Sequence, residues 1–138
     1  MFHRILIPLD LSERPSRAVE VAAQLADPAC RITLLHVVAE IEGVPADELG
    51  EFYAGLGGRA RQVLERHAKK LAEGGLASRV EIKVGRRGPE IVRLAEQDDT
   101  DLIVVGSHAI DPAQPGGGIG TLSHQIALLA PCDVLLVR

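Results

Sequence analysis

One segment of the chain has a composition suited to binding phosphate groups. It reads GSHAIDPAQPGGGIGT, residues 106–121, and holds five glycines and two prolines but neither Lys nor Arg. Its glycine run leads into a helical pattern, and backbone amides at a helix N-terminus attract anions. The alternative is a surface connection in which Thr121 serves only as the N-cap of that helix.

Several common catalytic and nucleotide-binding signatures are missing from this chain. It contains no Gly-Lys pair, so residues 106–121 are not a Walker P-loop. Gly118, Gly120 and Ser123 give only GxGxxS, which lies too far from the preceding strand for a dinucleotide fingerprint. No GxSxG elbow and no carboxylate pair beside a nucleophile occur. We therefore expect that the chain is not an enzyme.

The histidines are interpreted as structural or surface residues. His108 and His124 have no second histidine or carboxylate at a ligand spacing, which argues against a metal site. His36 lies within an apolar run and His67 on an apolar helical stripe. For both, a hydrogen-bonded structural histidine is the default expectation.

Composition and charge narrow the class of protein. A chain of 138 residues fits one domain, here residues 1–138, with a sizeable core. The net charge of -4 and 2% aromatic content argue against nucleic-acid binding. No signal peptide or membrane-spanning run is evident, and Cys30 and Cys132 read as two reduced thiols. We expect a cytoplasmic protein.

Strand and helix patterns alternate along the whole chain. Apolar or alternating runs predict five strands, at residues 4–9, 31–38, 79–84, 101–106 and 133–137. Helical patterns lie between them, at residues 13–26, from about 52 to 73, 88–97 and 121–129. Asp10 and Ser12 offer capping oxygens ahead of the first helix, and Gly74 and Gly75 end the second.

The second helix has an apolar stripe that indicates how it faces the core. The stripe consists of Phe52, Leu56, Ala60, Val63, His67 and Leu71.

This order predicts an α/β fold, a doubly wound parallel sheet of five strands with helices on both faces. Ligands on such sheets bind beyond the carboxyl ends of the strands, where the strand order reverses. The segments at residues 8–12 and 106–121 both follow carboxyl ends. If the first and fourth strands are neighbours, these segments share one crevice.

Four segments together resemble the universal stress protein family over essentially the whole chain. They are ILIPLDLS at the first strand, LLHVV at the second, LIVVGSHA at the fourth and APCDVLLVR at the end. The resemblance implies a Rossmann-like fold with strand order 3-2-1-4-5. It also implies that some members hold ATP or AMP, through a motif of Gly, two residues, Gly, nine residues, Gly and Ser or Thr. Here Gly106 matches the first glycine, Ala109 replaces the second, and ten residues precede Gly120 and Thr121.

The resemblance assigns roles to individual positions. Asp10 resembles the carboxylate that contacts the ribose or the metal-phosphate group, and its alternative role is the helix cap. Val37 resembles the residue whose backbone contacts the adenine edge, and Val105 lies against the base. The remaining implied nucleotide-binding residues are Pro8 and Leu9 at the adenosine end, with Gly106, Ala109, Gly120, Thr121 and Leu122 at the phosphates.

We expect a stress-response regulator that binds ATP or AMP, with or without a Mg ion on the phosphates. Binding would order residues 106–121, and a protein partner of unknown identity would recognise the ordered surface. The resemblance also implies a homodimer in which residues 133–137 of two chains pair, which would cover an exposed strand edge. The alternatives are a dimeric interaction protein without nucleotide, and a weak ATP hydrolase.

Overall fold

The computed structural model describes residues 2–11, 16–41, 43, 46–106 and 122–138. Five parallel strands form one sheet in the order β3-β2-β1-β4-β5, which confirms the expected topology. The strands are β1 (Phe2–Pro8), β2 (Ala26–Ala39), β3 (Ser78–Gly85), β4 (Leu102–Gly106) and β5 (Asp133–Val137). The helices are α1 (Arg17–Leu25), the 3-10 turn η1 (Ala46–Leu49), α2 (Gly50–Glu73), α3 (Arg87–Gln97) and α4 (Leu122–Leu129).

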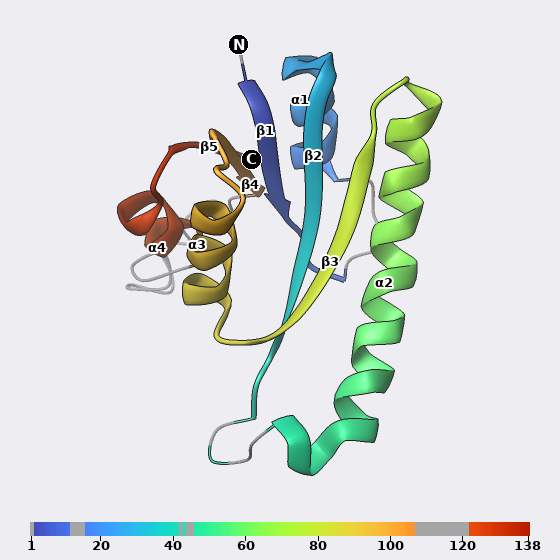
Figure 1. Cartoon of the computed structure of the whole chain (residues 1–138), viewed down its shortest axis with the longest axis vertical. Coiled ribbons are helices and arrows are strands. Elements are labelled where there is room, and N and C mark those ends of the chain that lie inside the picture. Colours follow the sequence, from blue (N-terminus) through green and yellow to red (C-terminus); the bar gives the residue numbers. More distant parts are fainter. Residues whose placement is uncertain (1, 12–15, 42, 44–45, 107–121) are drawn as a thin grey trace, which may run out of the picture.

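Two hydrophobic cores lie on opposite faces of the sheet. In β1, Ile5 and Ile7 face the core that α1 and α2 cover, whereas Leu6 faces the core that α3 and α4 cover. Figure 1 shows the long α2 on one side of the sheet and α3 and α4 on the other. The central strands are therefore buried on both faces, which explains their nearly continuous apolar sequences.

The first helix begins later than its sequence pattern suggests. Its N-cap is Ser16, whose Oγ accepts a hydrogen bond from the Val19 amide at 3.3 Å. The expectation that Asp10 caps this helix is therefore wrong. Ser16 directly follows Pro15, and proline is disfavoured inside a helix, so the cap lies after it. Ala26 already belongs to β2, so that strand also begins five residues before the predicted residue 31.

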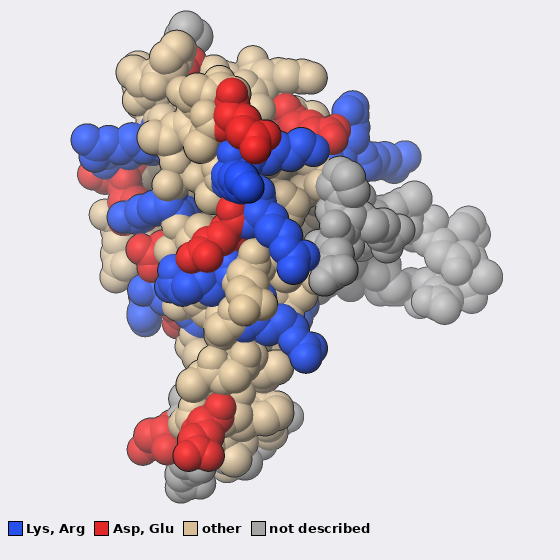
Figure 2. All heavy atoms as spheres, turned by 90° about the vertical axis from the view of Figure 1, so that its right-hand side faces the viewer, with Lys and Arg blue, Asp and Glu red and all other residues tan. Residues whose placement is uncertain are grey.

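The second helix differs from prediction in its first turn. Phe52 is 51% exposed, whereas its neighbour Tyr53 is buried and accepts a hydrogen bond from the Ile41 amide at 2.7 Å. From Ala60 onward the predicted stripe holds, with Val63 and Leu71 buried. The outer face of this helix is strongly charged. Figure 2 shows many Lys and Arg side chains over its middle and upper part, with acidic ones among them, and acidic side chains at its lower end.

The second helix ends in a Schellman motif. Gly75 has φ +82°, and its amide donates to the Ala72 carbonyl while the Leu76 amide donates to Leu71. Leu71 and Leu76 are both in the core, which supplies the apolar contact typical of this motif. Glycine is required at position 75 because other residues are strained at positive φ.

We expect Gly75→Ala to lower the free energy of unfolding by about 1 kcal/mol, because alanine is strained in the left-handed region. Urea denaturation measures the change. The matched control is Gly58→Ala, in the middle of the same helix, where an added Cβ meets nothing within 4 Å. That variant should instead gain about 0.5–1 kcal/mol. Equal effects of the two substitutions would contradict the assigned helix end.

Among the described residues, no helix combines the length and the apolarity that crossing a bilayer requires.

Candidate functional site

The strand order reverses between β1 and β4. The chain passes from β1 to β2 on one side, and β4 returns to lie on the other side of β1. Their register pairs Ile5 with Leu102 and Leu6 with Ile103. Continued by three residues, this register brings Leu9 level with Gly106. The two segments that follow β1 and β4 therefore leave the same edge of the sheet, at the position where doubly wound proteins bind ligands.

A buried histidine fixes the segment that follows β1. His36 is 7% exposed, and its Nδ1 lies 2.7 Å from the Leu9 carbonyl oxygen. Since a carbonyl only accepts, the ring must donate from Nδ1. The Leu9 amide in turn donates to the Leu35 carbonyl at 2.8 Å. Both backbone groups of Leu9 are thus held by β2, and the expected structural role of His36 is confirmed.

Two site valines belong to the core on the α3 and α4 face. Val37 is 4% exposed and Val105 is 5% exposed, and Leu122 packs partly buried against the same cluster. Because the Val37 side chain is almost fully buried, Val37 can contact a ligand only through its backbone. Pro8 is buried as well, so these described residues near the carboxyl ends of the strands form an apolar, well-packed surface layer of the core.

Among the described residues, none closely approaches the side-chain position at the end of β4. Gly106 is exposed, and a Cβ built on it would meet nothing within 4 Å. Its φ does not fall in the positive range. Neither packing nor backbone conformation in the described part of the chain therefore requires glycine at this position. Space for a ligand to approach the backbone closely is a use that glycine alone provides.

Asp10, after β1, lies close enough to His67 of α2 for its charge to act on that histidine. Asp10 is exposed, and His67 is half-buried in a hollow between α1 and α2 of about 340 Å³. Burial lowers the pKa of His67 below its ordinary value of 6.5, and Lys70 lowers it further, while the charge of Asp10 acts in the opposite direction. Among the described residues, no group of three metal-ligating side chains occurs.

The lowered pKa of His67 predicts sensitivity to acid. The unfolded chain binds a proton at this residue more readily than the folded chain, so acidification through pH 6.5 favours unfolding. We expect the stability of the wild type to fall more steeply between pH 7.5 and 5.5 than that of His67→Gln. Urea denaturation at several pH values provides the comparison. Parallel pH profiles would show that His67 contributes nothing to the acid response.

The phosphate half of the predicted site lies outside the described residues. This applies to Ala109, Gly120 and Thr121, and also to His108. The described site residues lie at or just after the carboxyl ends of neighbouring strands, or at the start of α4. They are Pro8, Leu9, Asp10, Val37, Val105, Gly106 and Leu122. Within the described part of the chain, the structure adds His36 to the site as a positioning residue for Leu9. A histidine within the apolar run LLHVV was its only signal in the sequence.

Strand order 3-2-1-4-5, with its reversal between β1 and β4, and helices on both faces define a Rossmann-like α/β protein. The chain belongs to the universal stress protein family, whose family model matches residues 1–138. A universal stress protein A homologue of Coxiella burnetii is 32% identical, and the match covers 99% of this chain and 96% of the relative. The solved structure of MJ0577, a universal stress protein of Methanocaldococcus jannaschii, has a TM-score of 0.84 at 29% identity, with 99% and 96% of the two chains covered.

Two more distant structures share the fold and hold nucleotides. A family member from Arabidopsis thaliana, solved with AMP bound, has a TM-score of 0.70 at 24% identity and covers 98% of this chain and 90% of its own. The universal stress protein of Archaeoglobus fulgidus, solved in complex with dAMP, has a TM-score of 0.69 at 16% identity. The match covers 99% of this chain and 98% of that protein.

Proposed function

We propose that this chain binds an adenine nucleotide, ATP or AMP, as a regulatory ligand at the carboxyl ends of β1 and β4. The observation that carries the proposal is the open space beside Gly106 at the reversal of strand order. A glycine that the described packing does not need, at the position where such sheets bind ligands, suits close approach of a phosphate to the backbone.

In this proposal each side of the crevice has its own task. The segment held by His36 presents Pro8 and Leu9 to the adenosine, and the backbone of Val37 reads the adenine edge. Asp10 contacts the ribose or, when Mg accompanies the nucleotide, the ion on its phosphates, which is the usual way that Mg is held by one carboxylate and a substrate. The remaining contacts come from Val105 and Leu122 beside the base and phosphates, and from Gly106, Ala109, Gly120 and Thr121 along the phosphates.

The relatives support an adenine nucleotide as the ligand class. Proteins of the same fold have been solved with AMP, dAMP and cAMP bound. All three contain adenine and one phosphate group, so adenosine monophosphates are the first ligands to test. The altered middle of the binding motif, with Ala109 and one additional residue, makes a direct measurement necessary.

Two measurements on the wild-type protein test the proposal. Mass spectrometry after denaturation should detect adenine nucleotide in protein purified under mild conditions. Added AMP or ATP should raise the melting temperature, since a ligand at a hundred times its dissociation constant stabilises by about 2.7 kcal/mol. If millimolar AMP and ATP both leave melting unchanged, the chain acts without nucleotide, through partner contacts. Release of ADP or AMP from ATP above the rate of a Gly120→Asp control would instead favour a hydrolase.

The exposed edge of the sheet supports a homodimer through β5. Leu136 on this strand is 46% exposed, and Leu128 on α4 is 71% exposed. The expected dimer pairs β5 of two chains and removes both apolar side chains and free backbone groups from water. Light scattering should give twice the chain mass for the wild type and a smaller mass for Leu136→Lys. A wild-type mass of one chain would contradict the dimer.

A further inference from the structure

A second hollow opens at the amino ends of the strands, opposite to the carboxyl ends where we propose the nucleotide site. Its volume is about 400 Å³. Three adjacent strands each contribute an arginine to its wall, Arg4 from β1, Arg31 from β2 and Arg79 from β3. We refer to it as the arginine hollow. It is far from the nucleotide crevice along the strands, because that crevice lies beyond their carboxyl ends.

The register of the sheet places the three arginines on one face. Arg4 pairs with Arg31, and Arg79 pairs with Thr33. Arg4 shares the face of Leu6, and Arg31 shares that of Leu35, both in the core covered by α3 and α4. Like charges directly opposite each other in a sheet are destabilising. The pairing of Arg4 with Arg31 therefore costs stability that a bound anion would recover.

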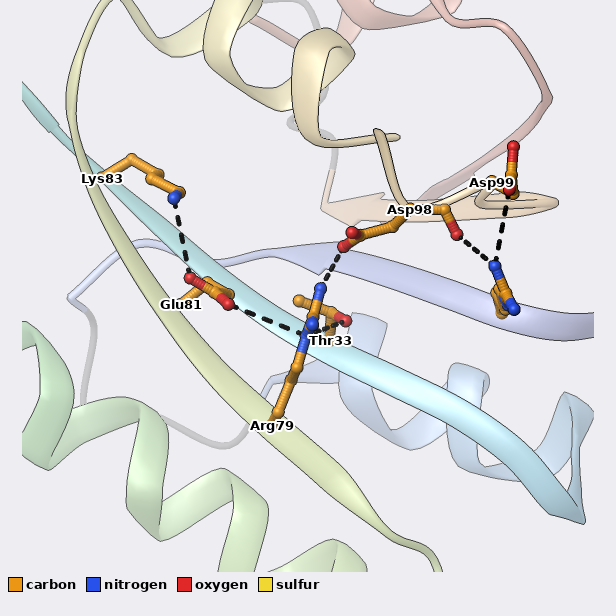
Figure 3. Close-up of polar contacts among 7 residues, drawn as sticks. Thr33, Arg79, Glu81, Lys83, Asp98 and Asp99 are labelled. Carbon is orange, nitrogen blue, oxygen red and sulfur yellow. Dashed lines mark hydrogen bonds and ion pairs between the residues drawn. The ribbon is translucent and has the colours of Figure 1, made fainter. Parts of the chain in front are cut away.

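Two of the three guanidinium groups are already held in place. Arg79 donates from Nε to Thr33 Oγ1 at 3.2 Å and pairs through Nη2 with the Asp98 carboxylate, as Figure 3 shows. Arg4 donates from Nη1 to the Asp98 carbonyl at 2.8 Å. Asp98 is itself fixed as the C-cap of α3. An anion arriving here would meet donors that have lost much of their freedom before binding.

The third arginine lies outside this network. Arg31 is exposed, and none of the contacts that hold Arg4 and Arg79 involves it. Asp98 supplies the one carboxylate among the described residues that line the hollow. Glu81 and Asp99 approach Arg79 and Arg4 at 3.8 and 3.7 Å, but they do not line it. The described lining residues thus include three arginines and one carboxylate, and Glu81 and Asp99 offset part of this positive charge from outside the hollow.

We propose that the arginine hollow binds a phosphate group, either free or carried by a small phosphorylated molecule. Guanidinium groups present paired N–H donors that match phosphate oxygens, and the Ser78 and Thr100 hydroxyls on the wall add further donors. The volume falls within the range of small-molecule pockets. Ile5, Ile32 and Ala77 give one part of the wall an apolar character that suits an organic moiety.

Amide NMR on the full chain tests this proposal with inorganic phosphate as the probe, at constant ionic strength against chloride. The amides of Ile32, Ser78 and Thr100 should shift and saturate. Arg31→Ala should weaken these shifts and leave any shift of the Gly106 amide as it is in the wild type. Arg31→Ala should weaken phosphate binding about tenfold or more, as expected for loss of a charged hydrogen bond. The matched control is Arg61→Ala on the exposed face of α2, which should bind phosphate like the wild type.

A gain of affinity provides a test that misfolding cannot imitate. Asp98→Asn removes the negative charge that competes with the anion. Its amide oxygen can still accept from Arg79, and its main-chain carbonyl still holds Arg4. We expect it to bind phosphate several-fold more tightly. Tighter binding of ribose 5-phosphate than of inorganic phosphate would identify a phosphorylated molecule as the ligand, and equal binding would identify free phosphate.

The proposal is overturned if phosphate gives only the linear, non-saturating shifts that chloride gives. It is also overturned if Arg31→Ala and Arg61→Ala bind phosphate equally, or if folded Asp98→Asn binds it more weakly than the wild type. These outcomes are measured on amides and arginines at the amino ends of the strands, so they are independent of whether the nucleotide crevice binds AMP.

Discussion

Gly106→Val should remove most of the stabilisation that AMP gives to the protein, while leaving the free protein about as stable as the wild type. The substituted position is exposed and an added Cβ meets nothing within 4 Å, so the described packing tolerates a larger side chain. Valine also suits the end of a strand. In the complex, its methyl groups would occupy the space through which a phosphate approaches the backbone.

Thermal melting with and without AMP measures this effect. At a hundred times the wild-type dissociation constant, the wild type should gain about 2.7 kcal/mol, and a variant weakened a hundredfold should gain only about 0.4 kcal/mol. The matched control is Ala29→Val, which adds two methyl groups at an exposed position of β2, near the amino ends of the strands. An undiminished AMP response in Gly106→Val would show that the nucleotide, if bound, lies elsewhere.

His36→Leu should lower the free energy of unfolding by about 1–3 kcal/mol. Leucine replaces the volume of the ring, but the part-buried Leu9 carbonyl loses the donor that lies 2.7 Å from it. The segment from Leu9 to Asp10 should then become less firmly placed, and AMP should bind several-fold more weakly.

Urea denaturation and AMP titration together examine this role of His36. His3→Leu makes the same change at an exposed position of β1, at the other end of the strand, and should leave stability and AMP binding nearly unchanged. Equal stabilities of the two variants would contradict a structural role for the His36 hydrogen bond. If His36→Leu is less stable but binds AMP normally, His36 stabilises the fold and does not position the nucleotide site.

Much of the fold was predictable because the local patterns agree with one another. Strands buried on both faces and regularly spaced helices leave few topologies for a five-stranded sheet. The first helix start was not predictable, since Asp10, Ser12 and Ser16 are all good caps and only the structure selects Ser16. In α2, two adjacent aromatic residues fit the stripe almost equally, and the hydrogen bond from Ile41 to Tyr53 decides which is buried.

The candidate site was predictable in its position and less so in its details. The strand order brings the ends of β1 and β4 together as expected. The helix-cap role of Asp10 was wrong, and the task of His36 depends on a contact across 27 residues of sequence. The arginine hollow was invisible in the sequence because Arg4, Arg31 and Arg79 meet only through strand register.

Calorimetric titration of AMP into the wild-type protein tests the central proposal most directly. We predict a saturating heat with one AMP bound per chain, and loss of that heat in Gly106→Val but not in Ala29→Val. Absence of any binding heat at millimolar AMP, repeated with ATP and Mg, would contradict a nucleotide site at the carboxyl ends of β1 and β4.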